Sequence, residues 1–339
     1  MNLYRLLKIF GKIRSRRVKL LAVFLMHIMH KRILGIYIDP VLGCNYRCRM
    51  CYFSDENKRK ELHGTIKDED LSLIAGALFH RALKLQIGCG AEPTLNDNLP
   101  RLINLGRKYG IPYISLTTNG RLVNREYLEH MIESGLDEIT VSAHGITKET
   151  YENLMTNGDY GHFMRLMNDF IAIKEKHPSF TVRLNYTMNE DNMEELGLFG
   201  NILGNIPIDI LQLRPIQKIG ESAYRNFSLE KIERMYDSII VPLVSYCSKR
   251  GIVCMVPEKN NFTILERQDN ANGIFEQLTY CYISPKICWR EDFDYKNESY
   301  ESYCKRHSVG KYIMKEFFSI NTKGNKAKDK TIKMNYKIK

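Results

Sequence analysis

The stretch Cys44-Asn-Tyr-Arg-Cys48-Arg-Met-Cys51 places three cysteines in a C-x3-C-x2-C spacing. Thiolates this close together can bind one compact metal centre, and iron–sulfur clusters are held by cysteine runs of this kind. A cluster of four irons needs four ligands, so with three cysteines one iron would accept a ligand from outside the protein. A structural zinc site is the alternative, but it usually needs four closed ligands, often as two spaced pairs. The chain holds no second C-x2-C.

On both sides of this stretch, short apolar or β-branched runs alternate with segments of helical periodicity. The expected strands are residues 33–38, 83–88, 112–117, 138–142, 181–186 and 209–213. The expected helices are residues 68–82, 98–109, 124–134, 148–177 (as two helices), 193–203 and 228–250. Such alternation predicts βα units and a parallel sheet. Right-handed crossovers would curl these units into a partial (β/α)6 barrel of the TIM type, so the expected fold class is α/β.

Each expected strand ends in polar or glycine-bearing residues. The cysteine stretch follows the first strand, and Gly88-Cys-Gly-Ala-Glu-Pro93 follows the second. Similar groups close the other strands at residues 117–120, 142–145, 185–189 and 214–217. Because chemistry in a parallel α/β barrel gathers at the carboxyl ends of the strands, we expect all six groups to face one cavity.

Over about residues 33–250, these features together resemble the radical S-adenosylmethionine (SAM) superfamily. Gly90-Ala91-Glu92-Pro93 is similar to the GGEP segment of that family, with alanine at the second position. The resemblance implies that Cys44, Cys48 and Cys51 bind a [4Fe–4S] cluster whose fourth iron is chelated by the methionine part of SAM. It also implies reductive cleavage of SAM to methionine and a 5′-deoxyadenosyl radical, which abstracts hydrogen from a substrate.

The resemblance further implies which residues bind SAM. Gly90 and Glu92 match the positions that accept bonds from its ammonium group, and Ser142 and Asn185 match positions that bond its ribose or carboxylate. Arg183 is expected to reach that carboxylate or to form an outward salt bridge, and His144 to be a satisfied structural histidine. Residues 142–151 look like the fourth-strand region of the subgroup with SPASM or twitch extensions. A flavodoxin or ferredoxin is the implied electron donor.

The cysteines beyond the sixth strand are a separate question. Their spacing does not match the dense SPASM pattern, although a shortened extension could hold one auxiliary cluster. Scattered free thiols, which bury well, are the alternative interpretation. The candidate ligands of such a second iron–sulfur cluster are Cys254, Cys281, Cys288 and Cys304. Cys89, within the glycine-rich segment, is expected to be a small buried neighbour rather than a ligand.

The net charge of +11 is concentrated at the two ends of the 339-residue chain. Residues 1–38 hold nine Lys or Arg and no acidic residue, and residues 322–339 hold seven Lys and one Asp, which leaves −4 for residues 39–321. A nucleic-acid groove across the core is therefore not expected.

We expect four segments: a basic amphipathic helical segment at 1–32, a radical SAM core domain at 33–250, a cysteine-bearing extension at 251–321, and a Lys-rich disordered tail at 322–339. The first segment is expected either to pack on the core or to lie on anionic lipid. Its apolar run is too short to span a bilayer and lacks a cleavage site, so we expect a cytoplasmic protein, with peripheral membrane contact as the alternative.

The sequence thus predicts a radical SAM enzyme that abstracts hydrogen from an unidentified substrate. A peptide or protein side chain is one candidate substrate, and a sugar or glycan precursor is another. Two rival functions are a non-catalytic iron–sulfur protein that transfers electrons and a zinc-stabilised interaction module at a membrane surface. The segment Gly90–Pro93 argues against the electron-transfer alternative, which needs a fourth cluster ligand and no SAM site.

Overall fold

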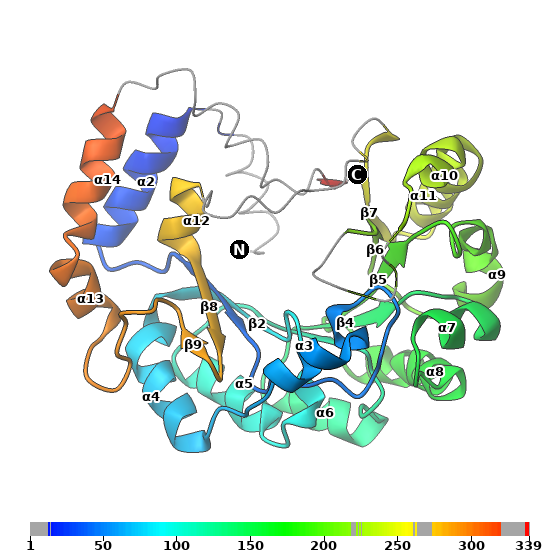
Figure 1. Cartoon of the computed structure of the whole chain (residues 1–339), viewed down its shortest axis with the longest axis horizontal. Coiled ribbons are helices and arrows are strands. Elements are labelled where there is room, and N and C mark those ends of the chain that lie inside the picture. The colour runs from blue at the N-terminus through cyan, green and yellow to red at the C-terminus, as the bar shows by residue number, and fades with distance from the viewer. Residues whose placement is uncertain are drawn as a thin grey trace.

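A computed structural model of the chain describes residues 13, 15–217, 222, 224, 226–259, 262, 273–319 and 336–338. Its strands form one curved sheet in the order β10-β7-β6-β5-β4-β3-β2-β1-β8-β9 (Figure 1). The strands from β7 to β8 in this order are parallel to their neighbours, and β10 and β9 pair antiparallel at the two edges. Their bounds are β1 (Leu34–Ile38), β2 (Ala82–Ile87), β3 (Ile114–Thr118), β4 (Glu138–Ala143), β5 (Thr181–Met188), β6 (Ile210–Pro215), β7 (Val253–Pro257), β8 (Tyr280–Ser284), β9 (Ile287–Cys288) and β10 (Tyr336–Ile338).

Helices cover the outer, convex side of this sheet (Figure 1). Those between the strands are α3 (Glu56–Glu61), α4 (Asp68–Leu78), α5 (Leu99–Lys108), α6 (Arg125–Glu133), α7 (Lys148–Leu154), α8 (Tyr160–Lys176), α9 (Phe199–Leu203), α10 (Glu230–Arg234) and α11 (Val241–Lys249). Short helical turns are η1 (Tyr52–Ser54), η2 (Phe79–Arg81), η3 (Pro93–Leu95), η4 (Glu194–Leu198) and η5 (Tyr236–Ile240). Side-chain caps start several of these helices. Asn124, Thr147 and Asp159 each accept a bond from a backbone N–H in the first turn of the helix that follows.

The central strands are buried on both faces, as parallel strands between helices and a filled interior must be. In β4 five of the six residues are buried, and the sixth, Ser142, is half-buried. The expected α/β class and open partial barrel are therefore confirmed, and residues 148–177 do form two helices, α7 and α8. The parallel part of the sheet is longer than expected, because β7 and β8 extend it beyond the six predicted strands.

The first described helix packs with helices that follow β7 in the sequence, beside the barrel. Helix α2 (Arg16–Ile28) lies against α12 (Ile274–Thr279) and α14 (Val309–Phe318), which follows α13 (Tyr300–Arg306). A small apolar cluster joins them through Leu20, Val23, Leu278 and Ile313. Residues 16–28 are thus a helix packed on the protein, whereas residues 1–12 and most of the Lys-rich tail lie outside the described residues. No helix within the described ranges is long and apolar enough to cross a bilayer.

Candidate functional site

The cysteine loop (residues 44–51) follows β1 and is held against the end of α7. The backbone N–H of Arg47 donates to the carbonyl of Thr156 at 2.8 Å, and that of Arg49 donates to Leu154 at 2.9 Å. Tyr46, the residue before Arg47, is almost completely buried. The loop that carries the three cysteines is therefore fixed to the barrel wall although it contains no strand.

All three cysteines line a cavity of about 290 Å³ at the carboxyl ends of the strands. Burial raises the pKa of Cys44 to about 12 and lifts the pKa of Cys48 and of Cys51 above the usual thiol range. For Cys48, the sulfurs of Cys51 and Cys44 add to the effect. A thiolate here loses hydration and meets other sulfurs, so it needs a cationic partner. A bound metal centre supplies that charge and holds cysteine in its deprotonated form.

A backbone and a side-chain donor point at one of the sulfurs. The N–H of Tyr46 donates to Cys44 Sγ at 3.4 Å, and Asn119 Nδ2 lies 3.8 Å from the same sulfur while donating to Asn45 Oδ1 at 2.7 Å. Hydrogen bonds to cluster sulfurs help to set the reduction potential. Within the described residues no group of three or more His, Cys, Asp or Glu could hold a single metal ion. In a cluster each thiolate binds a different iron, so the three sulfurs need not converge on one point.

The glycine loop (residues 88–93) forms the adjoining wall of the cavity. Gly88 has a φ of +82°, and a Cβ there would clash with the carbonyl oxygen of Thr117, so the turn requires glycine. A Cβ on Gly90 would lie 2.6 Å from Tyr52 Oη, which donates to the Gly90 carbonyl oxygen. The two loops are also joined directly, because the N–H of Glu92 donates to the carbonyl of Gly43 at 2.8 Å.

A buried carboxylate holds the glycine loop from behind. Asp39, at the end of β1, accepts bonds from the N–H of Cys89 at 2.7 Å and from the N–H of Gly90 at 3.1 Å. Tyr282 Oη on β8 donates to the same carboxylate at 2.8 Å. Only 1% of Asp39 is exposed. Asp39, at the end of β1, therefore links the glycine loop to β8, a strand that the sequence did not predict.

The carboxylate of Glu92 is buried and anchored by four donors. Its Oε1 accepts from Thr94 N at 3.1 Å, from Thr94 Oγ1 at 2.5 Å and from Thr118 Oγ1 at 2.6 Å, and its Oε2 accepts from Asn119 N at 2.7 Å. Burial raises the pKa of Glu92, while these donors oppose the shift. A carboxylate offers about four acceptor positions, two on each oxygen. Oε2, with its single donor, therefore keeps room for a cation in the cavity.

On β4 and β5, Ser142 and Asn185 are direct neighbours in the sheet register. Ser142 lines the cavity, and Asn185 Oδ1 is a buried acceptor without a hydrogen-bond partner. Buried polar atoms rarely lack a partner, so an orphaned amide oxygen suggests an absent ligand. Arg183, two residues earlier, pairs with Glu138 at 2.9 Å. Of the two alternatives for Arg183 the ion pair is the one found, although it is buried rather than outward.

Two predictions about single residues were wrong. Cys89 was expected to be buried, but it is exposed and lines the cavity. His144 was expected to be a satisfied structural histidine, but its Nδ1 is buried without a hydrogen-bond partner and the residue lines the same cavity. Burial lowers the pKa of His144 to about 4, so this side chain is neutral near pH 7.

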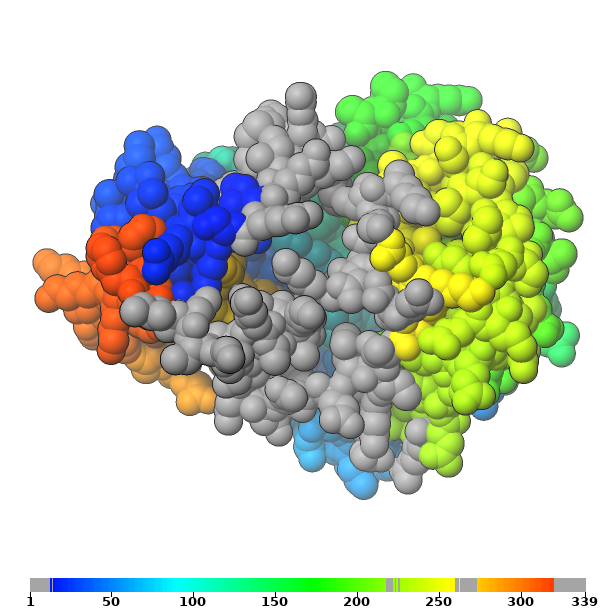
Figure 2. All heavy atoms as spheres, turned by 90° about the horizontal axis from the view of Figure 1, so that it is seen from above, coloured from blue at the N-terminus to red at the C-terminus, as the bar shows by residue number. Residues whose placement is uncertain are grey.

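The four candidate ligands of an auxiliary cluster do not come together. Cys254 on β7 is hydrogen-bonded to Cys247 of α11. Cys281, Cys288 and Cys304 lie on β8, β9 and α13. Strands β7 and β8 are at opposite ends of the parallel part of the sheet. Figure 2 shows α2 and α14 at one end of the molecule and the residues around β7 at the other. The predicted set of four ligands is therefore not formed.

A curved parallel sheet with three cysteines and a glycine loop at its carboxyl edge defines a class of cluster-binding barrel proteins. Residues 38–199 match the model of the radical SAM superfamily. Similar curated proteins include a probable GTP 3′,8-cyclase of Sulfolobus acidocaldarius, 25% identical over 194 residues that make up 56% of this chain and 59% of that protein. A protein of the same name from Saccharolobus solfataricus is 25% identical over 59% of this chain and 63% of its own length. The chain thus spans about three fifths of the length of these curated relatives.

Similar solved structures share the fold. Streptococcus suis SuiB bound to the precursor peptide SuiA has a TM-score of 0.61 at 16% identity, covering 91% of this chain and 72% of that one. SuiB bound to S-adenosylmethionine has a TM-score of 0.57 at 16% identity, covering 75% of this chain and 59% of the other. The structure of anSMEcpe with bound AdoMet has a TM-score of 0.52 at 19% identity, covering 65% and 63%.

Residues 38–199, which match the radical SAM superfamily model, contain both loops of the cavity. The predicted resemblance is confirmed at this level. The superfamily uses a [4Fe–4S] cluster and SAM, and the residues of the cavity fit both. Three half-buried thiols need a cationic centre, Glu92 Oε2 can accept from an ammonium group, and Asn185 Oδ1, on the strand beside the cavity residue Ser142, lacks a partner.

Sequence reasoning missed the residues that support the site from behind. Asp39, Tyr52 and Tyr282 all bond the glycine loop or its carboxylate anchor, but none lies in a motif that the sequence suggested. Asp39 stands directly at the end of the first strand, and its position there was the one available signal. Tyr282 belongs to a strand that was not predicted at all.

Proposed function

We propose that this chain is a radical SAM enzyme in which Cys44, Cys48 and Cys51 hold the cluster. The supporting observation is that the cysteine loop and the glycine loop are bonded to each other and share one cavity inside the region that matches the superfamily. When bound, the cluster and SAM supply reductive cleavage of a carbon–sulfur bond and a 5′-deoxyadenosyl radical that takes hydrogen from substrate.

The residues of the chain bind and orient SAM in this proposal. Glu92 Oε2 and the carbonyl oxygen of Gly90 accept from its ammonium group, and Ser142 and Asn185 bond its ribose or carboxylate. Asp39 holds the backbone N–H groups of the glycine loop, so that the carbonyl of Gly90 keeps a fixed direction. Preorganised polar groups of this kind lower the reorganisation needed when the reaction starts.

A decisive experiment is to reconstitute the full chain without oxygen, add SAM and a strong one-electron reductant, and measure 5′-deoxyadenosine. The proposal expects its formation by the wild-type chain and its loss in Cys48→Ala. The matched control is Cys288→Ala, a half-buried cysteine outside the cavity, which should keep the activity. If wild type contains the cluster and binds SAM but yields no deoxyadenosine, the proposed catalysis is wrong.

The metal content, sulfide content and spectrum of the same samples distinguish the proposed function from its two rivals. A zinc-stabilised interaction module predicts zinc and no sulfide in the purified chain. A non-catalytic electron-transfer protein predicts a cluster whose spectrum SAM does not change. Our proposal expects iron and sulfide in equal amounts, at about four of each per chain. A small flavodoxin or ferredoxin is the proposed electron donor in the cell, and replacement of the chemical reductant by such a protein tests it.

We propose as substrate either a peptide or protein side chain, or a sugar or glycan precursor. The solved structure of SuiB with its precursor peptide and the curated relatives named as probable GTP 3′,8-cyclases supply probes for this question. A peptide library, nucleotide sugars and GTP are added in turn to the assay. The substrate is the compound that increases deoxyadenosine formation and itself loses hydrogen, which deuterium transfer into deoxyadenosine detects. The relation to the SPASM or twitch subgroup stays a prediction.

We also propose that the protein contacts anionic lipid at a membrane surface through its N-terminal segment. Helix α2 packs its buried face on α12 and α14 but leaves Val18, Leu21, Leu25 and Ile28 exposed at spacings of three, four and three residues. Residues at this spacing share one helix face, and the segment before residue 39 carries nine basic residues.

Co-sedimentation with phosphatidylserine vesicles tests the contact. Wild type should bind these vesicles and not neutral ones, and Leu21→Gln with Leu25→Gln should abolish binding; equal recovery of both proteins would overturn the proposal.

A further inference from the structure

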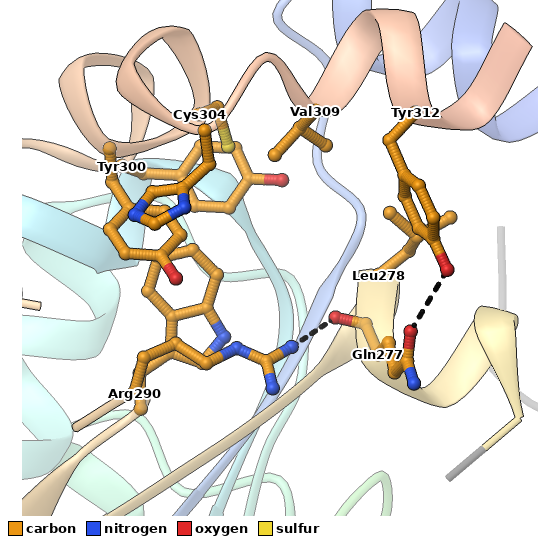
Figure 3. A pocket seen from close by; sticks show the side chains of 10 residues that line it. Gln277, Leu278, Arg290, Tyr300, Cys304, Val309 and Tyr312 are labelled. Carbon is orange, nitrogen blue, oxygen red and sulfur yellow. Dashed lines mark hydrogen bonds between the residues drawn. The ribbon is translucent and has the colours of Figure 1, made fainter. Parts of the chain in front are cut away.

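A second cavity, of about 510 Å³, lies away from the cysteine loop. It is lined by residues of α12, the end of β9, α13 and α14 (Figure 3). It shares no lining residue with the cavity of the cluster. Its volume falls in the range of small-molecule sites. The lining residues are Gln277, Leu278, Trp289, Arg290, Tyr300, Tyr303, Cys304, His307, Val309 and Tyr312.

The charges around this second cavity favour an anion. Its lining contains Arg290 and His307 and no carboxylate. His307 Nε2 lies 2.8 Å from Asp292 Oδ2, so this nitrogen already has a polar partner. Arg290 Nη2 donates to the backbone carbonyl of Gln277, as Figure 3 shows, and no described carboxylate pairs with this guanidinium. An arginine has five N–H donors in a fork that fits carboxylate, sulfonate or phosphate groups.

An unpartnered donor lies beside this arginine. The Arg290 guanidinium carbon lies 5.6 Å from the centre of the Trp289 ring. Trp289 is 9% exposed, and its indole Nε1 is buried without a hydrogen-bond partner. A buried N–H group that lacks an acceptor is destabilising, and native proteins usually provide one. An acceptor on a bound ligand would remove this penalty.

The backbone of Trp289 is also strained. Its φ is +65°, a left-handed conformation that is costly for a large side chain. The strand pairing holds it in place, since its N–H donates to the carbonyl of Tyr282 at 2.8 Å. Strained residues of this kind cluster at ligand-binding and catalytic sites. The strain therefore supports a binding role for Trp289 independently of the unpartnered Nε1.

The remaining walls are aromatic and apolar. Tyr300 stacks on Trp289 with ring centres 5.2 Å apart, and Tyr303 is tilted toward the same ring at 4.7 Å. Leu278 and Val309 complete the apolar surface. Such walls contact a flat or bulky hydrocarbon body, and the two donors act on one polar end of it.

We propose that this cavity binds a small organic anion with an aromatic or other apolar body. Arg290 and Trp289 Nε1 donate to the anionic group, and Tyr300, Tyr303 and Leu278 contact the body. This site is distinct from the SAM cavity, and its occupancy does not depend on SAM cleavage.

Trp289 is the one tryptophan of the whole sequence, so all indole emission comes from a residue that lines this cavity. The probe is 8-anilinonaphthalene-1-sulfonate, an aromatic sulfonate, and the neutral comparison compound is N-phenyl-1-naphthylamine. The reconstituted full chain is excited at the indole band and titrated with each compound. We expect saturable energy transfer from Trp289 to one bound sulfonate per chain, and at least about tenfold weaker binding of the neutral compound, because a hydrogen bond to a charged group is lost.

Variants of Arg290 test whether this residue binds the sulfonate. Arg290→Gln should weaken binding of the sulfonate at least about tenfold, and Arg290→Lys, which keeps the charge, should weaken it less. Arg101→Gln, an exposed arginine on α5, is the matched control and should bind as wild type does. Far-ultraviolet circular dichroism shows whether each variant is folded. The proposal is overturned by non-saturable transfer, by equal binding of the neutral compound, or by wild-type affinity in a folded Arg290→Gln.

Discussion

Replacement of Asp39 by asparagine tests whether the glycine loop is held by a carboxylate behind it. Asp39 accepts from two backbone N–H groups, of Cys89 and Gly90, and from Tyr282 Oη. Asparagine has nearly the same shape, but one acceptor oxygen is replaced by an NH2 donor. In one orientation the NH2 group faces the N–H of Cys89; in the other, Tyr282 Oη accepts from the NH2 group and both backbone N–H groups share the single, uncharged oxygen. A donor left without an acceptor costs about 1–3 kcal/mol, and hydrogen bonds to a charged acceptor contribute about 1.5–3 kcal/mol each.

Asp39→Asn should therefore lower the free energy of unfolding by about 2–4 kcal/mol. If half of this loss falls on the geometry of the loop that faces SAM, affinity for SAM falls by about 1–2 kcal/mol, or roughly five- to thirtyfold. Equilibrium dialysis with radiolabelled SAM measures the affinity on the anaerobically reconstituted chain, and denaturant unfolding measures stability.

Tyr282→Phe is the matched control for this experiment. It removes one donor and leaves the carboxylate with both backbone bonds, so the loss in SAM binding should be smaller, about fivefold or less. The reasoning is refuted if Asp39→Asn keeps its cluster and binds SAM within twofold of wild type.

Three further predictions concern other parts of the structure. Gly90→Ala should weaken SAM binding at least tenfold because its Cβ meets Tyr52 Oη, and the same change in a Tyr52→Phe background should cost less; equal losses in both backgrounds contradict the steric explanation. The pKa of His144 is lowered to about 4, so the native state stays neutral while the unfolded chain takes up a proton as pH falls below about 6.5. Unfolding free energy should fall by about 1 kcal/mol between pH 7 and pH 5.5 in wild type relative to His144→Gln, and parallel pH profiles would exclude this role. Cys254→Ser should leave the iron content at about four per chain, because Cys254 bonds Cys247 and not the other C-terminal cysteines; a wild-type content near eight that falls in the variant would restore the auxiliary cluster.

The parts of the site that depend on local signals were predictable. The cysteine spacing, the glycine loop and the βα alternation are all properties of neighbouring residues, and the structure brings both loops to one cavity. Gly88 is a clear case, because only a residue without a Cβ can adopt its turn beside Thr117.

The supporting contacts depend on residues far apart in the sequence and were missed for that reason. Asp39 and Tyr282 are separated by 243 positions, and their bond exists because β8 pairs with β1. The run that forms β8 alternates tyrosine, cysteine and apolar residues within the expected cysteine-bearing extension, and it was assigned to that extension rather than to the sheet. For the same reason Cys281 and Cys254 remain candidate ligands of one auxiliary cluster in the sequence, although their strands occupy opposite ends of the parallel sheet.

Exposure could not be read from the sequence either. Cys89 was judged by its residue type, which is usually buried. Its actual position is set by the turn at Gly88 and by the bond from its N–H to Asp39, which leave the side chain at the cavity wall. The local sequence patterns therefore predict where the two loops lie in the chain. Tertiary contacts determine which of their side chains face the cavity.

The central claim is that the cluster held by Cys44, Cys48 and Cys51 leaves one iron open for SAM. Electron paramagnetic resonance of the reduced, reconstituted full chain, recorded with and without SAM, tests it most directly. Our account predicts a [4Fe–4S] signal whose g values change when SAM is added. A signal of the same intensity and shape in both samples, at saturating SAM, would contradict the claim.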